Sequence, residues 1–457
     1  MLRSIWLLFV YIAFCGLGAS APFIFALGYI WVDTFRPQEN AYIILNQLPV
    51  AMIMGAAAVG SYFVFDRKDP PRLTLAGAIP GLMAVWCTVT MLWAVAPESG
   101  WTKWDWAFKT LAFSAFLPLV IRSRVQIEAM AQVYLFSLAG NIIPFGVKTM
   151  ISGGGYGMNL GLASGNSGLA EGGLLSTFCL MAVPIAHYLS KHAQLIPMNI
   201  ATKAAYLGII VLAIVTALGT FERSALLGVG VLGIYMFMRS RRKLIFGMVL
   251  AVGATVLLYT SSGLFMKRME TIGSYHADNS ALTRLAVWRW TLNFSFTHPL
   301  GGGFNSYVIN VIETPGDAAN PESLIQNGRA FHSSYFEFLG EQGWPGLAMF
   351  LTAAFSTIMS LQRLAKRTRN IPHLAWCADM SDALQSGIMV FMTSGAFVGL
   401  AFQPIFWYFV VLSVSLREYV RRVNALSTTT KSTGWRGAVR SASPSPGLPA
   451  PTGWQRR

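Results

Sequence analysis

The feature that most constrains this chain is a series of apolar runs, separated by short connections. Helical runs of about 20 apolar residues can cross the ~30 Å hydrocarbon core of a bilayer. Hydrophobic residues make up 54% of the 457-residue chain and charged residues only 12%, against roughly a quarter charged in a soluble protein. The sequence therefore predicts an all-α polytopic membrane protein and excludes a water-soluble fold.

The apolar runs predict about 12 membrane-spanning helices. Spans are expected near residues 42–65, 73–96, 105–121, 127–150, 166–189, 204–219, 224–238, 244–262, 343–362, 385–402 and 404–416. Residues 4–35 are too long for one helix and short for two, and their start also resembles a secretory signal peptide. We favour an uncleaved first span, because another apolar segment follows without a soluble domain.

The net charge of +15 comes mostly from short loops rather than from one amphipathic face. The basic residues in these loops are Arg67, Lys68, Arg72, Arg122, Arg124, Lys191, Lys203, Arg239, Arg241, Arg242, Lys243, Arg363, Lys366, Arg367, Arg369, Arg417, Arg421 and Arg422. All fall on one side when the spans are counted, and the positive-inside rule makes that side cytoplasmic. The charge therefore predicts orientation in a bilayer and not nucleic-acid binding.

The expected organisation has five regions. Transmembrane regions cover residues 1–126, 127–262 and 342–424, a long external loop covers residues 263–341, and a disordered cytoplasmic tail covers residues 425–457. The tail is rich in Ser, Pro and Gly. A loop as long as 263–341 is usually functional or disordered, and its aromatic content argues against disorder.

The stretch "NSALTRLAVWRWTLNFSFTHPLGGGF" predicts an amphipathic helix within the external loop. Asn279 or Ser280 can cap its start, and Pro299 with the three following glycines can end it. Its apolar residues at helical spacing are Leu285, Trp288, Leu292 and Phe296. This face can lie on the membrane surface or on the helical bundle. The segment "PLGGGF" is not a phosphate-binding P-loop, because no strand precedes it and no Gly-Lys-Ser follows.

Four stretches carry a resemblance to a known superfamily. "TFERSALLGVGVLGIY", "LTRLAVWRW", "HPLGGGFNSY" and "FHSSYFEFLGEQGWPGLAMFL" are together similar to the O-antigen ligases and polymerases. The N-terminal third, with "GYIWVDTFRPQ" and "GWTKWDWAFKTL", resembles the O-glycosylation ligases associated with exosortase systems. Two spacings agree with ligase signatures. Three residues separate Arg223 from Leu227, and ten separate His332 from Gly343.

The resemblance implies a GT-C-like membrane fold and a glycosyltransferase or ligase. Such enzymes take a glycan from undecaprenyl pyrophosphate, at the periplasmic face of the bacterial inner membrane, and transfer it to an acceptor hydroxyl. The acceptor is a lipid, a protein or another glycan, and the sequence does not identify which. No cofactor is expected, and no Asp-rich or His-rich external set predicts a metal. A metal-independent, inverting glycan ligase is the leading hypothesis that the resemblance supports.

Arginines are the expected diphosphate contacts, because a guanidinium binds phosphate oxygens bidentately and stays charged. Arg223 lies at a tight external turn between two apolar spans, where a cation is costly unless it faces a cavity or a partner. Arg284 and Arg289 share the loop helix but lie about 140° apart around its axis. We expect Arg223 and Arg284 to bind the donor diphosphate, and Arg289 to serve packing or a cation–π contact.

His332 is the expected catalytic residue, because a neutral imidazole can take a proton from an acceptor hydroxyl. The resemblance assigns the same role to this histidine. A histidine that orients the acceptor, contacts the diphosphate or only precedes a helix capped by Ser333 or Ser334 is the alternative. Glu337 and Glu341 share a helix face, and we expect them to be interfacial carboxylates.

The stretch "ISGGGYGMNLGLASGNSGLAEGG" is a weaker candidate for the donor cavity. Asn166 and Glu171 lie in it, beside the next span. Flexible turns explain its glycines equally well. Two other functions stay open at this point. A repeat-unit polymerase would use the same donor and the same residues, and a lipid or glycan transporter would show internal repeats and polar groups within broken spans.

Overall fold

The computed structural model describes residues 2–41, 44–66, 69–152, 171–239, 279–314 and 324–441. Its first helices are α1 (Leu2–Ser20), α2 (Phe23–Phe35), α3 (Pro37–Asn40), α4 (Ile44–Gln47), α5 (Val50–Phe65), α6 (Leu75–Thr90), η1 (Met91–Trp93), α7 (Pro97–Val120), α8 (Arg124–Ser152), α9 (Gly172–His192), α10 (Ile200–Gly219) and α11 (Arg223–Arg239). Then follow α14 (Asn279–Thr297), η3 (Ser306–Ile309), β1 (Val311–Thr314), β2 (Leu324–Asn327), α15 (Ser334–Thr368), η4 (Pro372–Leu374), α16 (Ala375–Ser394) and α17 (Pro404–Ser441).

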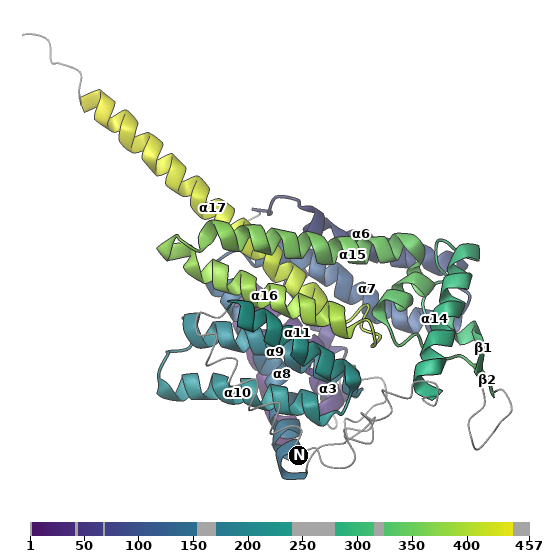
Figure 1. Ribbon diagram of the computed structural model, residues 1–457. Coiled ribbons are helices and arrows are strands. Elements are labelled where there is room, and N and C mark those ends of the chain that lie inside the picture. Colours follow the sequence, from purple (N-terminus) through teal and green to yellow (C-terminus); the bar gives the residue numbers. More distant parts are fainter. Residues whose placement is uncertain are drawn as a thin grey trace, which may run out of the picture.

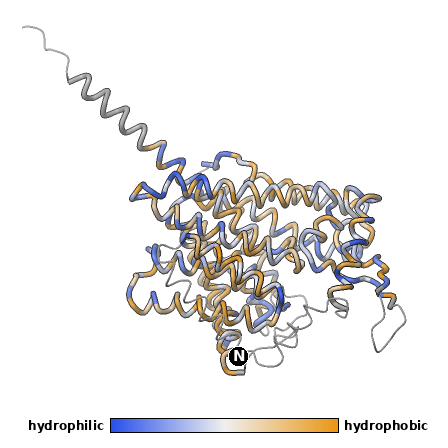
Figure 2. The backbone as a smooth tube through the Cα atoms, in the orientation of Figure 1, coloured by the Kyte–Doolittle hydropathy of each residue, from blue (hydrophilic) through white to orange (hydrophobic). Residues whose placement is uncertain are grey.

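The long helices form a bundle, and α14 crosses one end of it beside the antiparallel hairpin β1–β2 (Figure 1). Helix α9 is buried along almost its whole length, and it packs against α8, α10, α11 and α16. Helix α15 packs against α6, α16 and α17, and its first turns contact α14. Apolar residues dominate the bundle (Figure 2). Helices suit this environment because they satisfy their own backbone hydrogen bonds.

Six of the described helices are long and apolar enough to span a membrane. They are Leu2–Ser20, Leu75–Trp93, Arg124–Ile151, Gly172–His192, Ile200–Gly219 and Ser334–Thr368. Helices α2 and α5 are apolar but shorter. These findings fit a polytopic membrane protein, and the expected count of about 12 spans stays a prediction. The span expected at residues 244–262 lies outside the described residues.

Residues 4–35, whose topology the sequence left open, form two helices, α1 and α2. Two other sequence-based boundaries are wrong. The span expected at residues 385–402 is instead α16, which ends at Ser394, and turns fill residues 395–403. Helix α17 continues to Ser441, so the first part of the expected disordered tail is helical. The segment up to Ser441 lacks proline, and the first proline of the tail is Pro444.

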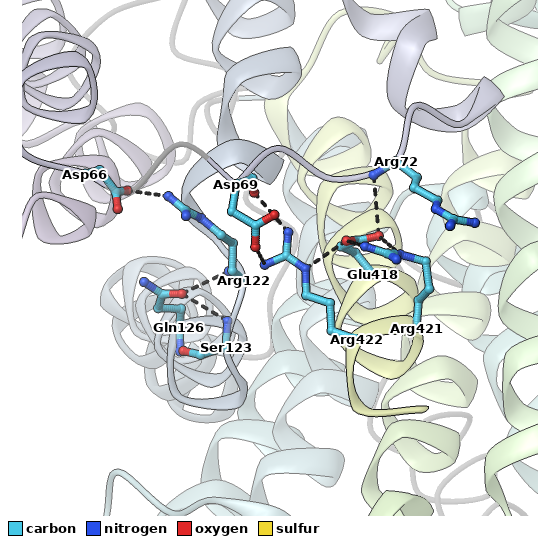
Figure 3. A network of polar contacts seen from close by, with 9 residues as sticks. All are labelled: Asp66, Asp69, Arg72, Arg122, Ser123, Gln126, Glu418, Arg421 and Arg422. Atoms are coloured by element: carbon cyan, nitrogen blue, oxygen red, sulfur yellow. Dashed lines mark hydrogen bonds and ion pairs between the residues drawn. The ribbon is translucent and has the colours of Figure 1, made fainter. Parts of the chain in front are cut away.

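Ion pairs join the loops at one end of the bundle, which we call the basic end (Figure 3). Glu418 on α17 accepts hydrogen bonds from Arg421 and Arg422. Arg122, after α7, pairs with Asp66, after α5, at 2.6 Å. Further ion pairs join α11, α15 and α16 at the same end. We call the opposite end, which carries α14, the site end.

A kink within α15 holds α14 against the bundle. Gly343 has φ +67° and ψ −168°, in the middle of the helix. A Cβ atom there would lie 2.3 Å from the carbonyl oxygen of Pro299. The segment that follows α14 therefore packs backbone to backbone on the kink, and only glycine fits at this position. This packing gives a physical reason for the ten-residue spacing between His332 and Gly343.

The kink predicts a large cost for Gly343→Ala. A strained φ costs about 1–3 kcal/mol, and an overpacked contact costs a similar amount. We therefore expect the free energy of unfolding to fall by about 2–5 kcal/mol, measured as a lower thermal midpoint in detergent. Gly208→Ala is the control, because a Cβ at Gly208 on α10 meets nothing within 4 Å. Equal midpoints for the two variants would contradict the packing described.

Candidate active site

Arg223 is the first residue of α11. Helix α10 ends at Gly219, and Phe221 takes a left-handed conformation with φ +55°. The tight turn predicted between these two apolar segments is thus present. The side chain of Arg223 is half-buried. Its position at a helix N-terminus adds the positive end of the helix dipole to the charge of the guanidinium.

Arg223 and Arg284 line the same cavity, which has a volume of about 450 Å³. Its walls are α11, α14 and Phe397, from the turn after α16. The lining residues are Arg223, Ser224, Leu226, Leu227, Ala281, Arg284, Leu285, Trp288 and Phe397. Most of these side chains are apolar, and two are arginines. Such a cavity suits an amphiphile with an anionic group and a hydrocarbon chain.

The spacing between Arg223 and Leu227 has a structural reason. Residues four apart lie on one face of a helix, and both side chains line the cavity. Leu227 adds apolar surface directly beside the guanidinium. The signature therefore describes one cavity-facing stripe of α11.

Two polar atoms at the cavity have no hydrogen-bond partner within the described residues. They are the Oγ of Ser224 and the Nε of Arg284. Ser224 is only 4% exposed, and buried polar groups are nearly always paired. Both atoms belong to residues that line the cavity, so a partner for either one lies outside the contacts among the described residues. Ser224 was not predicted as a site residue, although it follows Arg223 directly and lines the same cavity.

Arg289 does not line the cavity. It lies five residues after Arg284 on α14, which is about 140° around the helix axis, and its side chain is exposed. The prediction that the two arginines cannot share one phosphate agrees with this placement. The buried face of α14 consists of Val287, Thr291, Phe294 and Ser295. Arg289 lies outside that face, and a packing or cation–π role for it stays a prediction.

The apolar face predicted for α14 is only partly covered by the bundle. Leu285, Leu292 and Phe296 are 50%, 38% and 74% exposed. Leu285 nevertheless lines the cavity beside α11, and the ring centroid of Phe296 lies 6.4 Å from that of Trp344 on α15. Both placements left open for this face therefore stay open. Trp288 is half-buried and turns towards the cavity wall.

Trp288 joins the cavity to the segment that contains His332. Its indole Nε1 donates a hydrogen bond to the carbonyl oxygen of Phe331 at 2.9 Å. Its ring stacks on Phe336, with centroids 5.0 Å apart and planes 8° from parallel. Trp288 lies one turn after Arg284 on the same face of α14. Trp288 thus helps to set the distance between the cavity wall that carries Arg284 and the backbone beside His332.

His332 lies just before α15 and not within it. Its φ is +47°, a conformation that few non-glycine residues adopt. Ser333 occupies the N-cap but makes no side-chain capping bond. The hydroxyl of Ser334 instead donates to the carbonyl of Val398 and accepts from the backbone N–H of Leu400. The expected serine cap is therefore absent, and Ser334 fixes α15 to the turn before α17.

The pKa of His332 is lowered from its ordinary value. Desolvation by the surrounding protein is the largest cause, followed by the positive charges of Arg284 and Arg329, and Glu337 opposes them. The imidazole is therefore neutral at pH 7 and able to accept a proton. His332 is not a lining residue of the cavity, but it lies within electrostatic reach of Arg284.

Arg329 is one of the charged residues around His332. It was not predicted as a site residue. Its backbone N–H donates to the side chain of Asn310, and its carbonyl accepts from the same side chain, at 2.9 and 2.7 Å. Asn310 is fully buried. The segment leading to His332 is thus fixed by an asparagine after α14, a long-range contact that the sequence does not reveal.

Glu337 and Glu341 are buried, so the expectation of interfacial carboxylates is wrong. They are 9% and 0% exposed. Lys103 on α7 lies between them, with its Nζ 2.5 Å from Glu337 and 2.8 Å from Glu341. The helical spacing of the two carboxylates was visible in the sequence. Their common partner was not, because it lies more than 230 residues earlier.

Of the two candidates in the glycine-rich stretch, Asn166 lies outside the described residues. Glu171 directly precedes α9. Desolvation of its carboxyl, together with Glu222 and Glu337, raises its pKa to about 7, and Arg284 acts in the opposite direction. Glu171 therefore lies within electrostatic reach of Arg284 as an acid that is partly protonated at neutral pH.

Comparison with known families gives two matches. Residues 208–351 match a family described as O-Antigen ligase, and residues 2–194 match a "Family of unknown function (DUF5935)". The first match contains Arg223, Arg284 and His332, and it supports the O-antigen ligase superfamily that the motifs indicated. With the apolar helices, it points to a multi-pass membrane protein with ligase or polymerase activity in polysaccharide biosynthesis. A search of curated proteins found no match.

The electrostatics of the site predict a measurable shift for Arg284→Met. Removing this positive charge should raise the pKa of His332, because Arg284 disfavours the imidazolium. The pH dependence of His332 carbethoxylation, followed by peptide mass spectrometry, measures this, since only the neutral imidazole reacts. Arg289→Met is the matched control on the same helix and should leave the midpoint unchanged. Identical midpoints in both variants would contradict the placement of Arg284 beside His332.

Proposed function

We propose that the protein is a glycosyltransferase of the O-antigen ligase type. It moves a glycan from undecaprenyl pyrophosphate to an acceptor hydroxyl, in O-glycosylation or polysaccharide ligation. The observation that carries the proposal is the cavity between α11 and α14. It combines Arg223 and Arg284 with apolar walls, and a polyprenyl diphosphate has the same two parts. The family match at residues 208–351 supports it.

In the proposed reaction, the acceptor oxygen attacks the anomeric carbon of the donor sugar. The bond from this carbon to the diphosphate oxygen breaks, and negative charge develops on the leaving group. Arg223, Arg284 and the N-terminus of α11 stabilise that charge. His332 takes the proton of the acceptor hydroxyl as a general base. Attack opposite the leaving group inverts the anomeric centre.

The proposed location is the bacterial inner membrane, with the site end in the periplasm. The basic end gathers the loops rich in Lys and Arg, and such loops stay cytoplasmic. The resemblance of the N-terminal third favours the subtype associated with exosortase systems. The acceptor is then a secreted protein or an extracellular glycan.

A repeat-unit polymerase is the alternative within the same superfamily. It would use the same donor, the same arginines and the same base. A transporter or flippase is the alternative of another class. The polar groups of the described site gather at one end of the bundle and not at its middle, which favours transfer over transport.

The direct test is transfer of lipid-linked glycan by the purified protein. His332→Ala should reduce the rate by about 10²–10⁴-fold, the usual contribution of a general base. His298→Ala is the matched control, since this exposed histidine follows α14 and lies outside the proposed site. A chelator should leave the wild-type rate unchanged. Undiminished transfer by His332→Ala would contradict the assigned role.

The size of the product separates the two enzymatic alternatives. A ligase moves one intact chain and gives a single shift in acceptor mass. A polymerase gives a ladder of repeats from the same donor preparation. Movement of the lipid across liposomes without a covalent product would instead support the transporter.

A further inference from the structure

A cluster of ion pairs joins the N-terminal region of the chain to the start of α15, shortly after His332 in the sequence. Lys103 lies on α7, within the region that matches the family of unknown function. Its two partners, Glu337 and Glu341, lie in the first two turns of α15, within the O-antigen ligase match. The N-terminal region thus contacts the helix that begins two residues after His332.

The two carboxylates also accept hydrogen bonds from the backbone of two loops. Glu337 Oε2 accepts a hydrogen bond from the backbone N–H of Ala401 at 3.2 Å. Glu341 Oε1 accepts from the backbone N–H of Asn305 at 3.0 Å. The turn before α17 and the segment after α14 therefore meet at the same two side chains as Lys103. The ammonium also lies 5.8 and 5.5 Å from the ring centroids of Phe304 and Phe402.

The balance of charge in this cluster makes Lys103 indispensable to it. The Lys103 side chain is 14% exposed and that of Glu341 is 0% exposed. One cation serves two carboxylates, and Glu341 Oε2 has no partner among the described residues. Removing one member of a buried ion pair leaves an uncompensated charge, which is far costlier than losing a surface pair. Without Lys103, Glu337 and Glu341 would lose their shared hydrogen-bond donor, and they would either repel each other one helical turn apart or take up a proton.

We infer that Lys103 is a positioning residue for His332. Through Glu337 and Glu341 it fixes the first turns of α15, and these turns hold His332 in its left-handed conformation, within electrostatic reach of Arg284. The inference rests on the proposed function, and it gives the region of unknown function a part in the reaction. That region supplies the charge that orders the catalytic segment, while donor binding stays with α11 and α14.

If Lys103 positions His332, removing its charge should lower the turnover number and leave donor binding nearly unchanged. Lys103→Met should lower kcat by about 100-fold, the loss that a misplacement of about 1 Å produces. The KM for the lipid donor should stay within about twofold, because the arginines are untouched. Lys103→Arg should recover most of the turnover, because a guanidinium can bridge two carboxylates. Lys109→Met is the matched control on α7, where Lys109 forms an exposed pair with Asp105.

The double variant Lys103→Met/Glu341→Gln keeps the test decisive if Lys103→Met unfolds. It removes one cation and one anion, so its thermal midpoint should recover towards that of the wild type. A positioning role predicts that kcat stays low in this folded protein. Recovery of kcat together with the midpoint would overturn the inference and make Lys103 a stabilising residue only.

Hydrogen exchange supplies a readout independent of activity. The amides of residues 334–341 should exchange faster in the folded double variant than in Lys109→Met. Equal exchange in the two variants would overturn the inference even if transfer is impaired. If wild type and His332→Ala show the same transfer, the proposed function fails. If they differ and Lys103→Met keeps wild-type kcat, this inference alone fails.

Discussion

Residues 299–303 lie so close to residues 340–344 that Gly301 and Gly343 have no room for a side chain. Backbone hydrogen bonds join the two segments, from Gly302 to Gly340 and from Trp344 to Pro299. This contact carries α14 across the end of the bundle, and α14 carries Arg284 and Trp288. The position of Arg284 and Trp288 relative to His332 therefore depends on the backbone contact between these two segments.

The sequence predicted those parts of the fold that follow from local pattern. Apolar runs gave the helical bundle, and Pro299 with its following glycines marked the end of α14. The tight turn before Arg223 was visible because Arg223 and Glu222 interrupt two apolar runs. Boundaries at residues 385–402 were wrong, because apolar composition does not distinguish a helix from the buried turns that follow α16.

The candidate site was predictable only where a spacing carries a geometric meaning. Arg284 and Arg289 could be separated by their angle around a helix, and the cavity contains the one that was favoured. Glu337 and Glu341 were misjudged, because nothing near them in sequence indicates Lys103. Ser224 and Arg329 were missed for a similar reason, since burial and long-range contacts leave no local pattern. The sequence motifs therefore indicated several site residues, and the structure added the residues that contact them.

The central claim is that the cavity between α11 and α14 binds a polyprenyl diphosphate. The most direct measurement is photolabelling with a polyprenyl diphosphate that carries a photoreactive group near its head, followed by peptide mapping. We expect adducts on residues 223–227 and 281–288, which unlabelled diphosphate suppresses and which Arg284→Met reduces. Labelling elsewhere on the bundle, or labelling of these peptides that unlabelled diphosphate does not suppress, would contradict it.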